Sequence, residues 1–383
     1  MKIAVPRETA ASETRVAATP DTVKRLVGLG AKVVVEKDAG KSAQIPDADY
    51  ITAGAELGDT RAATLADADV VLTVRRPAAD AVAEMKSGAL LIGAMDPYGN
   101  EADLAVIGKQ GVAAFAMEFM PRITRAQSMD ILSSQANLAG YQAVIEGAAN
   151  YGRALPMMMT AAGTVPAARV FVMGAGVAGL QAIATARRLG AVVTATDVRP
   201  AAKEQVESLG AKFIAVEDDE FRQAETAGGY AKEMSAEYRK KQAELVAAHI
   251  AKQDIVITTA LIPGRPAPKL VDKDMLASMK PGSVLVDLAA ERGGNVEGTK
   301  AGKIATVGGV KIVGYDNMAG RIPASASALY AKNLVTFLET MIDKETKALA
   351  PNWDDELVKA TCLTRDGAVV HPAFAAAKPE GEA

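Results

Sequence analysis

Residues 168–179 read ARVFVMGAGVAG, an apolar, β-prone run that stops at three glycines spaced G-x-G-x-x-G. A helix-patterned stretch at 180–189 follows, and a second apolar run at 191–196 ends in Asp197. A strand, a glycine turn, a helix and a second strand in this order are typical of a βαβ unit that binds a dinucleotide. This stretch therefore predicts a doubly wound α/β domain.

The three glycines have separate roles at such a turn. Gly174 permits the tight turn off the strand, Gly176 removes the Cβ that would keep a pyrophosphate from the backbone, and Gly179 lets the helix pack against the strand. The helix N-terminus beside Val177 offers free N–H groups and the positive end of a dipole. Asp197, roughly 20 residues on, can accept hydrogen bonds from a ribose. These five residues predict a dinucleotide site; the alternative is a glycine-rich turn without a ligand.

The acid at Asp197 also bears on which dinucleotide binds. A carboxylate repels the 2′-phosphate of NADP, so NAD(H) is the expected cofactor. Arg199, two residues further on, weakens this preference because it could pair with that phosphate.

The composition excludes several classes of protein. The 383 residues are enough for two or three domains, and a net charge of −3 with both signs mixed gives no footprint for nucleic acid. Cys362 is the only cysteine, and His249 and His371 are far apart, so we expect no metal site. The N-terminal residues 1–8 carry charges where a secretory signal would be apolar. No apolar run approaches the ~18 residues of a membrane span. We expect a soluble, cytoplasmic protein.

Apolar runs alternate with helix-patterned stretches along the chain, which predicts parallel sheets with right-handed crossovers. The expected strands of the first half are 2–5, 32–35, 70–74, 90–95 and 113–117. Those of the second half are 170–173, 192–196, 213–216, 255–259, 284–288 and 312–313. We therefore expect two doubly wound, Rossmann-like α/β domains, separated by a cleft that suits a nicotinamide ring.

Two long helical stretches connect the expected domains. Residues 133–150 would leave the first domain and enter the second, and residues 325–349 would return to the first. The first domain is then discontinuous, made of residues 1–132 plus 330–383. Residues 133–329 would form the nucleotide-binding domain.

One connection in the second half is longer than the fold requires. Residues 217–241 are polar and highly charged, and they contain a Gly-Gly-Tyr sequence that ends at Tyr230. Long loops in compact α/β domains are usually functional or disordered. We favour a mobile loop over residues 220–240 with Tyr230 at its tip. The alternative is a solvated loop that leads into a charged helix at 236–249.

Neither histidine of the chain is placed where it could act as an acid or base in hydride transfer. Hydride transfer to a carbonyl or imine normally needs a side chain that handles a proton, and histidine is the usual choice. His249 lies at the end of an expected helix and His371 in the C-terminal tail, so neither suits that role. This favours a reaction without proton transfer in the active site, such as hydride exchange between two nicotinamides.

The densest polar cluster is PRITRAQSMD at residues 121–130, followed by Ser133. It comes directly after the expected strand 113–117, at the end where parallel sheets place their sites. Arginine, glutamine, aspartate and serine side chains can together hold a carboxamide and ribose hydroxyls. The N-terminus of a helix with capping residues would explain the same cluster.

The start of the chain, residues 3–20, reads IAVPRETAASETRVAATP. It resembles alanine dehydrogenases and the NAD(H)-binding component of proton-translocating NAD(P) transhydrogenases, and the resemblance covers nearly the whole chain. Alanine dehydrogenases carry a substrate lysine and a histidine in the first domain. Here residues 74–77 and 92–97 read VRRP and IGAMDP, so arginine replaces the lysine and the histidine is absent. Residues 121–130 resemble the transhydrogenase active-site loop, and the insertion around Tyr230 resembles its mobile loop.

The resemblance implies a role for each matching residue. Arg122, Asp130 and Ser133 would hold the nicotinamide carboxamide of NAD(H), and Gln127 would face the nucleotide on a partner. Tyr230 would close over the bound nucleotide. The glycines and the acid described above would hold its pyrophosphate and ribose.

The resemblance also implies partners. Hydride would pass directly between NAD(H) on this chain and NADP(H) on a partner subunit, coupled to proton translocation by a separate membrane-spanning subunit. The chain would be a homodimer and would associate peripherally with the inner membrane through its partners. The alternatives are a free-standing alanine dehydrogenase-like enzyme and a nucleotide-binding protein without turnover.

Overall fold

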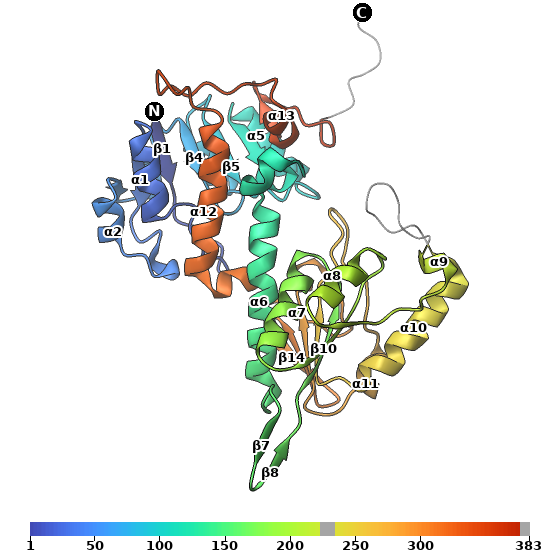
Figure 1. The fold of residues 1–383 in the computed structure, drawn as a ribbon. Coiled ribbons are helices and arrows are strands. Elements are labelled where there is room, and N and C mark those ends of the chain that lie inside the picture. The colour runs from blue at the N-terminus through green and yellow to red at the C-terminus, as the bar shows by residue number, and fades with distance from the viewer. Residues whose placement is uncertain (223–233, 376–383) are drawn as a thin grey trace, which may run out of the picture. The chain divides into compact units, whose positions relative to one another are not determined.

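The computed structural model describes residues 1–222 and 234–375. Two large sheets of mainly parallel strands, each flanked by helices, account for most of this part of the chain (Figure 1). The α/β class with Rossmann-like sheets, predicted from the alternation of strands and helices, is therefore confirmed.

The chain divides into two compact units. The first combines Met1–Gln135 with the chain from Ile322 onward, and the second is Ala136–Arg321. The boundary after Gln135 falls within α6 (Ile131–Tyr151), a helix of 21 residues. The predicted helix at 133–150 is thus present.

The first unit contains a six-stranded sheet in the order β3-β2-β1-β4-β5-β6, with every neighbouring pair parallel. The strands are β1 (Lys2–Val5), β2 (Lys32–Glu36), β3 (Glu56–Gly58), β4 (Val70–Leu72), β5 (Leu90–Gly93) and β6 (Ala113–Ala116). Helices cover both faces, so these strands read as continuous apolar runs, which is why all but the short β3 were predictable.

Alternate residues of β1 enter different cores. Ile3 and Val5 pack in the core that includes residues of α1 (Pro20–Gly28) and α12 (Pro323–Glu339). Ala4 packs on the other face, with residues of α5 (Glu101–Lys109). The other helices of this unit are α2 (Asp47–Thr52), α3 (Arg61–Leu65), α4 (Ala79–Ala83), α13 (Glu356–Thr361), η1 (Lys41–Ala43), η2 (Met117–Phe119) and η3 (Thr124–Met129). A hairpin of β16 (Thr364–Arg365) and β17 (Ala368–Val369) completes it.

The second unit contains a seven-stranded sheet in the order β11-β10-β9-β12-β13-β15-β14. The strands are β9 (Arg169–Met173), β10 (Val192–Thr196), β11 (Lys212–Phe213), β12 (Ile255–Thr258), β13 (Val284–Asp287), β14 (Lys303–Val307) and β15 (Val310–Gly314). The order reverses between β9 and β12, which is where doubly wound sheets bind their ligands.

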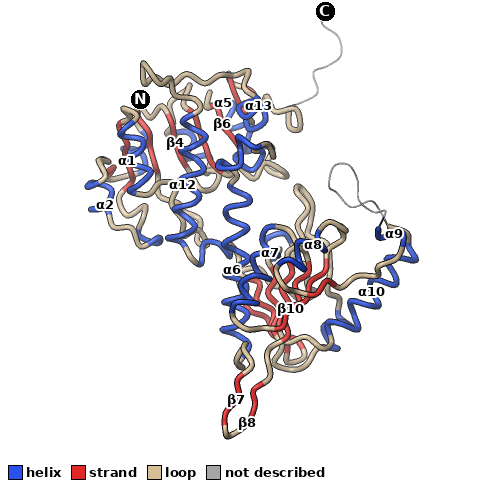
Figure 2. The backbone as a smooth tube through the Cα atoms, in the orientation of Figure 1, coloured by secondary structure: helices blue, strands red, loops and turns tan. Residues whose placement is uncertain are grey.

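The helices of the second unit connect these strands. They are α7 (Val177–Arg188), α8 (Ala202–Ser208), α9 (Asp219–Arg222), α10 (Ala236–Ile250), α11 (Lys273–Ser278), η4 (Ala290–Arg292) and η5 (Met318–Arg321). A separate hairpin of β7 (Met158–Thr160) and β8 (Gly163–Val165) extends away from this sheet (Figure 2).

The strands β3, β7, β8 and β14 were not predicted, and β11 is shorter than the strand expected at 213–216. Two differences have a local explanation. The helix expected at 325–349 ends as α12 at Glu339, because the Thr340 hydroxyl donates to the Phe337 carbonyl and Asp343 organises the turn that follows. The last expected strand, at 312–313, was placed in a parallel sheet with no strand directly before it. It is present as β15, and it pairs with β14, the one antiparallel neighbour in this sheet among the described residues. Consecutive glycines with positive φ join the two strands at 308–309.

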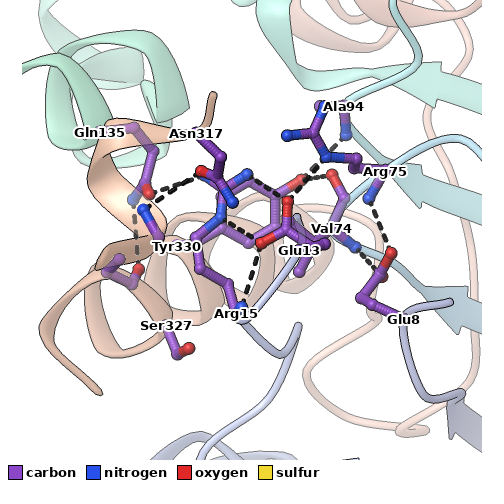
Figure 3. Close-up of polar contacts among 12 residues, drawn as sticks. Glu8, Glu13, Arg15, Val74, Arg75, Ala94, Gln135, Asn317, Ser327 and Tyr330 are labelled. Atoms are coloured by element: carbon purple, nitrogen blue, oxygen red, sulfur yellow. Dashed lines mark hydrogen bonds and ion pairs between the residues drawn. The ribbon is translucent and has the colours of Figure 1, made fainter. Parts of the chain in front are cut away.

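Five side chains of the first unit form a cluster that we call the acid cluster: Glu8, Glu13, Arg15, Arg75 and Tyr330 (Figure 3). The Glu13 carboxylate accepts hydrogen bonds from Arg15 Nε at 2.8 Å and Nη2 at 2.7 Å, and from Arg75 Nε at 2.7 Å. The Arg15 guanidinium also lies 5.6 Å from the centre of the buried Tyr330 ring. Two arginines therefore hold one buried carboxylate within the protein.

The two acids of the cluster ionise differently. Burial raises the pKa of Glu8 to about 7, although the N–H of Val74, 2.6 Å from its carboxylate, favours the charged form. Burial also disfavours ionised Glu13, but the bound Arg15 guanidinium outweighs it and lowers the pKa of Glu13 to about 2. Near neutral pH, Glu13 is charged and Glu8 titrates.

The raised pKa of Glu8 predicts how stability depends on pH. An acid whose pKa is higher in the folded chain than in the unfolded chain binds protons more tightly when the chain is folded. The contribution of Glu8 to the free energy of unfolding is therefore greatest below pH 4.5 and is lost as the pH rises to about 7. Relative to the wild type, Glu8→Gln should gain a few kcal/mol of unfolding free energy across this range, at ~1.4 kcal/mol per pKa unit. Urea unfolding followed by Trp353, the single tryptophan of the chain and part of the first unit, measures this.

The matched control for this prediction is Glu56→Gln, which changes an exposed glutamate on β3. It should leave the pH profile of unfolding parallel to that of the wild type. A Glu8→Gln profile that also runs parallel would contradict the assigned titration.

Candidate functional site

The glycine turn joins β9 to α7 in the second unit. Gly174 has a φ of +107°, which an L side chain rarely adopts, and a Cβ at Gly179 would lie 1.8 Å from the Gly174 carbonyl oxygen. A Cβ at Gly176, by contrast, would meet no atom within 4 Å. Both outer glycines are required by the fold, whereas the middle one borders open space.

That open space lies where a pyrophosphate could approach the backbone. The helix α7 begins at Val177, which is 44% exposed, and its first N–H groups have no partner within the helix. Free N–H groups and the positive dipole end favour an anion here. The residues present therefore fit a dinucleotide.

Asp197 follows β10 and is bound from two sides. Its Oδ2 accepts a hydrogen bond from the Ala175 N–H at 2.7 Å. Arg199 donates its backbone N–H and Nε to Oδ1, both at 2.9 Å, and Nη2 to Oδ2 at 3.0 Å. Burial opposes ionisation, but Arg199 and the Ala175 amide outweigh it and hold the pKa of Asp197 below its usual range.

The pairing with Arg199 changes how the acid is interpreted. The sequence shows an arginine two residues after Asp197, but only the structure shows a bidentate ion pair between them. The carboxylate is fixed against the glycine turn, and its charge is largely compensated. Any preference that the sequence suggested from the charge of Asp197 alone therefore has to take Arg199 into account.

The polar cluster of the first unit follows β6, as the sequence predicted. Asp130 and Ser133 are brought together: Asp130 accepts from the Ser133 N–H at 2.9 Å and from its hydroxyl at 2.5 Å, at the start of α6. Arg122 and Gln127 have exposed side chains. The capping geometry is therefore present, and it pre-orients the Asp130 carboxylate.

Arg125 of the same loop is turned to another element. Its Nη1 and Nη2 donate to the Asp355 carboxylate at 3.0 and 2.9 Å, just before α13. The pair is partly exposed, so it stabilises the loop only weakly.

Residues 74–77 and 92–97, compared above with alanine dehydrogenases, make contacts within the first unit. Arg75 binds Glu13, as described above. Arg76 donates to the Asp96 carbonyl oxygen at 2.9 Å and pairs with Asp103 at 2.9 Å. The backbone at Asp96 has a φ of +44°, and its N–H donates to Glu118. The two arginine side chains, Arg75 and Arg76, are thus engaged with the protein itself.

The two histidines occupy structural positions. The His249 ring lies 2.8 Å from the Thr194 hydroxyl, and the His371 ring stacks on Phe119. Burial lowers the pKa of both histidines.

Tyr230 lies outside the described residues. The part of the connection that is described includes α9 and the start of α10. The charged helix expected at 236–249 in the alternative interpretation of this connection is present as α10. Within residues 1–222 and 234–375, acidic, histidine and cysteine side chains form no group suited to a metal ion. In the same ranges no helix combines the length and apolar character of a membrane span.

Comparisons with known proteins cover both units. The family models for the alanine dehydrogenase/PNT N-terminal and C-terminal domains match residues 4–139 and 143–372. The first part of the NAD(P) transhydrogenase alpha subunit of Rhodospirillum rubrum is 58% identical over 379 residues, which cover 98% of this chain and 99% of that one. The alanine dehydrogenase of Halomonas elongata is 33% identical, covering 98% and 96%.

Solved structures of the same two kinds of protein are also similar to this chain. The transhydrogenase from Sinorhizobium meliloti superimposes with a TM-score of 0.89 at 64% identity and covers 97% of this chain and 100% of that one. An L-alanine dehydrogenase superimposes with a TM-score of 0.81 at 25% identity. The chain belongs to the alanine dehydrogenase/PNT family and, within it, to the NAD(P) transhydrogenase alpha subunits.

Proposed function

We propose that this chain is the NAD(H)-binding subunit of a proton-translocating NAD(P) transhydrogenase. The observation that carries the proposal is its near-full-length similarity to the NAD(P) transhydrogenase alpha subunit of Rhodospirillum rubrum. The nicotinamide ring supplies the chemistry, since it gives or accepts a hydride. The protein has to bind the nucleotide, orient it and limit its contact with water.

The second unit binds the phosphate and ribose end of NAD(H). The first N–H groups of α7, beside Gly176 and Val177, receive the pyrophosphate, and Asp197 accepts from the adenosine ribose. Two properties support this: Gly176 borders open space, and Asp197 is held ionised by Arg199. Gly174 and Gly179 are needed for the turn itself.

The loop of the first unit orients the nicotinamide end. Arg122, Asp130 and Ser133 hold the carboxamide, for which they offer both donors and acceptors. Gln127 faces the nucleotide on the partner subunit. The exposure of Arg122 and Gln127 supports these roles, and Tyr230 is proposed to close over the nucleotide.

A metabolite substrate fits this chain less well. An amino-acid dehydrogenase needs a group that moves a proton, and no histidine is present in residues 92–97. Arg75, in place of the lysine, forms an ion pair with Glu13. A free-standing alanine dehydrogenase-like enzyme remains the second candidate because distant members of the family carry that name.

The proposal includes the assembly. The partners are an NADP(H)-binding subunit, which holds the second nucleotide, and a membrane-spanning subunit, which couples hydride transfer to proton translocation. The chain is a homodimer that is cytoplasmic and attached peripherally to the inner membrane through these partners.

Reconstitution tests the function directly. The purified chain with NADH and an NADP(H)-binding subunit should reduce an NADP⁺ analogue whose reduced form absorbs at a different wavelength from NADH.

Gln127→Asn should slow a single turnover at least about tenfold while NADH affinity stays within about threefold, because it misplaces one positioning group. Arg122→Ala should weaken NADH binding about 10–100-fold through loss of a charged hydrogen bond. NADH formation from NAD⁺ and alanine, without a partner, would favour the second candidate.

The middle glycine gives a second test. Gly176→Val should fold normally, since the site is open and the φ of Gly176 is −75°, but the side chain should block the pyrophosphate. We expect NADH affinity to fall more than about tenfold, as measured by calorimetry, with little change in unfolding free energy. The matched control, Gly179→Ala, should instead destabilise the second unit, because its Cβ would lie 1.8 Å from a carbonyl oxygen. Unchanged NADH affinity in Gly176→Val would contradict the assigned site.

A further inference from the structure

Asn333 of α12 has a buried side-chain amide that binds η3 and the start of α6, both of which are far from it in sequence. It is 7% exposed. Its Nδ2 donates to the Ser128 carbonyl oxygen at 2.8 Å, and its Oδ1 accepts from the Ser134 hydroxyl at 2.7 Å. Ser128 lies next to Gln127 in η3, and Ser134 lies next to Ser133 in the first turn of α6.

The orientation of this amide is fixed by its surroundings. The Ser128 carbonyl can only accept, so the amino group of Asn333 must face it. The amide oxygen is then left for the Ser134 hydroxyl, whose other acceptor, the Ile131 carbonyl, is more distant at 3.3 Å. Each atom of the amide therefore has one assigned partner.

The other contacts that hold the loop are weaker or less directional. Residues 124–129 form a 3₁₀ helix, whose hydrogen bonds have poorer geometry than those of an α-helix. Ala126 and Met129 contribute apolar contacts, but these do not fix the direction of a backbone carbonyl. The ion pair of Arg125 with Asp355 is partly exposed and contributes little. Asn333 supplies a directional, buried contact.

The network continues from Ser134 to the acid cluster. Gln135 donates through Nε2 to the Ser134 hydroxyl at 3.3 Å, and its Oε1 accepts from Arg15 Nη1 at 2.9 Å. Figure 3 shows Gln135 and Arg15 in this arrangement. The half-buried Arg15, which binds Glu13, thus supports the same helix start that carries Ser133.

We propose that Asn333 is a positioning residue for hydride transfer, held in its orientation by Ser134. The inference rests on the proposed function, in which Gln127, Asp130 and Ser133 orient the nicotinamide. Asn333 holds the η3 segment against the start of α6, so it sets the distance between Gln127 and the Asp130–Ser133 pair. Small displacements of orienting groups slow group transfer far more than they weaken binding. Its effect is therefore on the transfer rate.

The first experiment compares variants of Asn333 by NADH affinity and by single-turnover transfer to the NADP(H)-binding subunit. Asn333→Ala should slow transfer about 10–100-fold and change NADH affinity less than about threefold. Asn333→Asp keeps the volume and the bond from Ser134 but sets a carboxylate oxygen against the Ser128 carbonyl, so it should be at least as slow. Ser134→Ala should slow transfer about tenfold, whereas Ser134→Thr, which retains the hydroxyl, should restore it.

The matched control is Ser327→Ala. Ser327 is a fully buried polar residue on the same helix, but its hydroxyl accepts from the Val16 N–H rather than from the loop. It should lower the stability of the first unit, measured by Trp353 fluorescence, and leave transfer within about twofold of the wild type.

Hydrogen exchange of the amides in residues 122–130 provides a readout without a partner subunit. Asn333→Ala should accelerate exchange in this segment, and Ser327→Ala should not. Unchanged exchange, or equal slowing of transfer by Ser327→Ala, would overturn the positioning role. Failure of the wild-type chain to transfer hydride would instead refute the proposed function, and the exchange data would still decide whether Asn333 holds the loop.

Discussion

The second unit depends on the close approach of α7 to the end of β9. Residue 179 has no room for a Cβ, because that atom would lie 1.8 Å from the carbonyl oxygen of Gly174. Only glycine allows the helix to begin here, with its free N–H groups beside the open space at Gly176. The parallel register of β10 on β9 pairs Thr196 with Met173, so Asp197 emerges next to the turn and binds the Ala175 N–H. The steric constraint at Gly179 thus sets where α7 begins, and the strand register sets the place of Asp197.

The acid cluster of the first unit shows how a buried carboxylate is held by the protein itself. In the acid cluster Glu13 binds both Arg15 and Arg75. A buried charge is stable only with a partner, and here the partner is another side chain of the protein. This pairing explains why Glu13 stays ionised, whereas burial outweighs the backbone N–H groups bound to Glu8 and raises its pKa to about 7.

The loop after β6 combines two properties that the sequence presented as alternatives. Asp130 and Ser133 cap the start of α6, and the same contact holds the carboxylate in one orientation. Capping and ligand binding are compatible, because a carboxylate has more acceptor sites than the two that Ser133 uses. The roles of Arg122, Gln127, Asp130 and Ser133 toward a nucleotide stay predictions.

The sequence by itself determined the α/β class, most strands and the glycine turn, because these follow from local patterns: continuous apolar runs, glycine spacing and the residues next to them. Tertiary structure decided the rest. The Asp197–Arg199 ion pair depends on side-chain direction, and the reversal of β14 depends on the edge it pairs with. Asn333 binds Ser128 across 205 residues, and Glu13 binds Arg75 across 62. No local pattern contains such contacts, because they exist only after the strands and helices have packed.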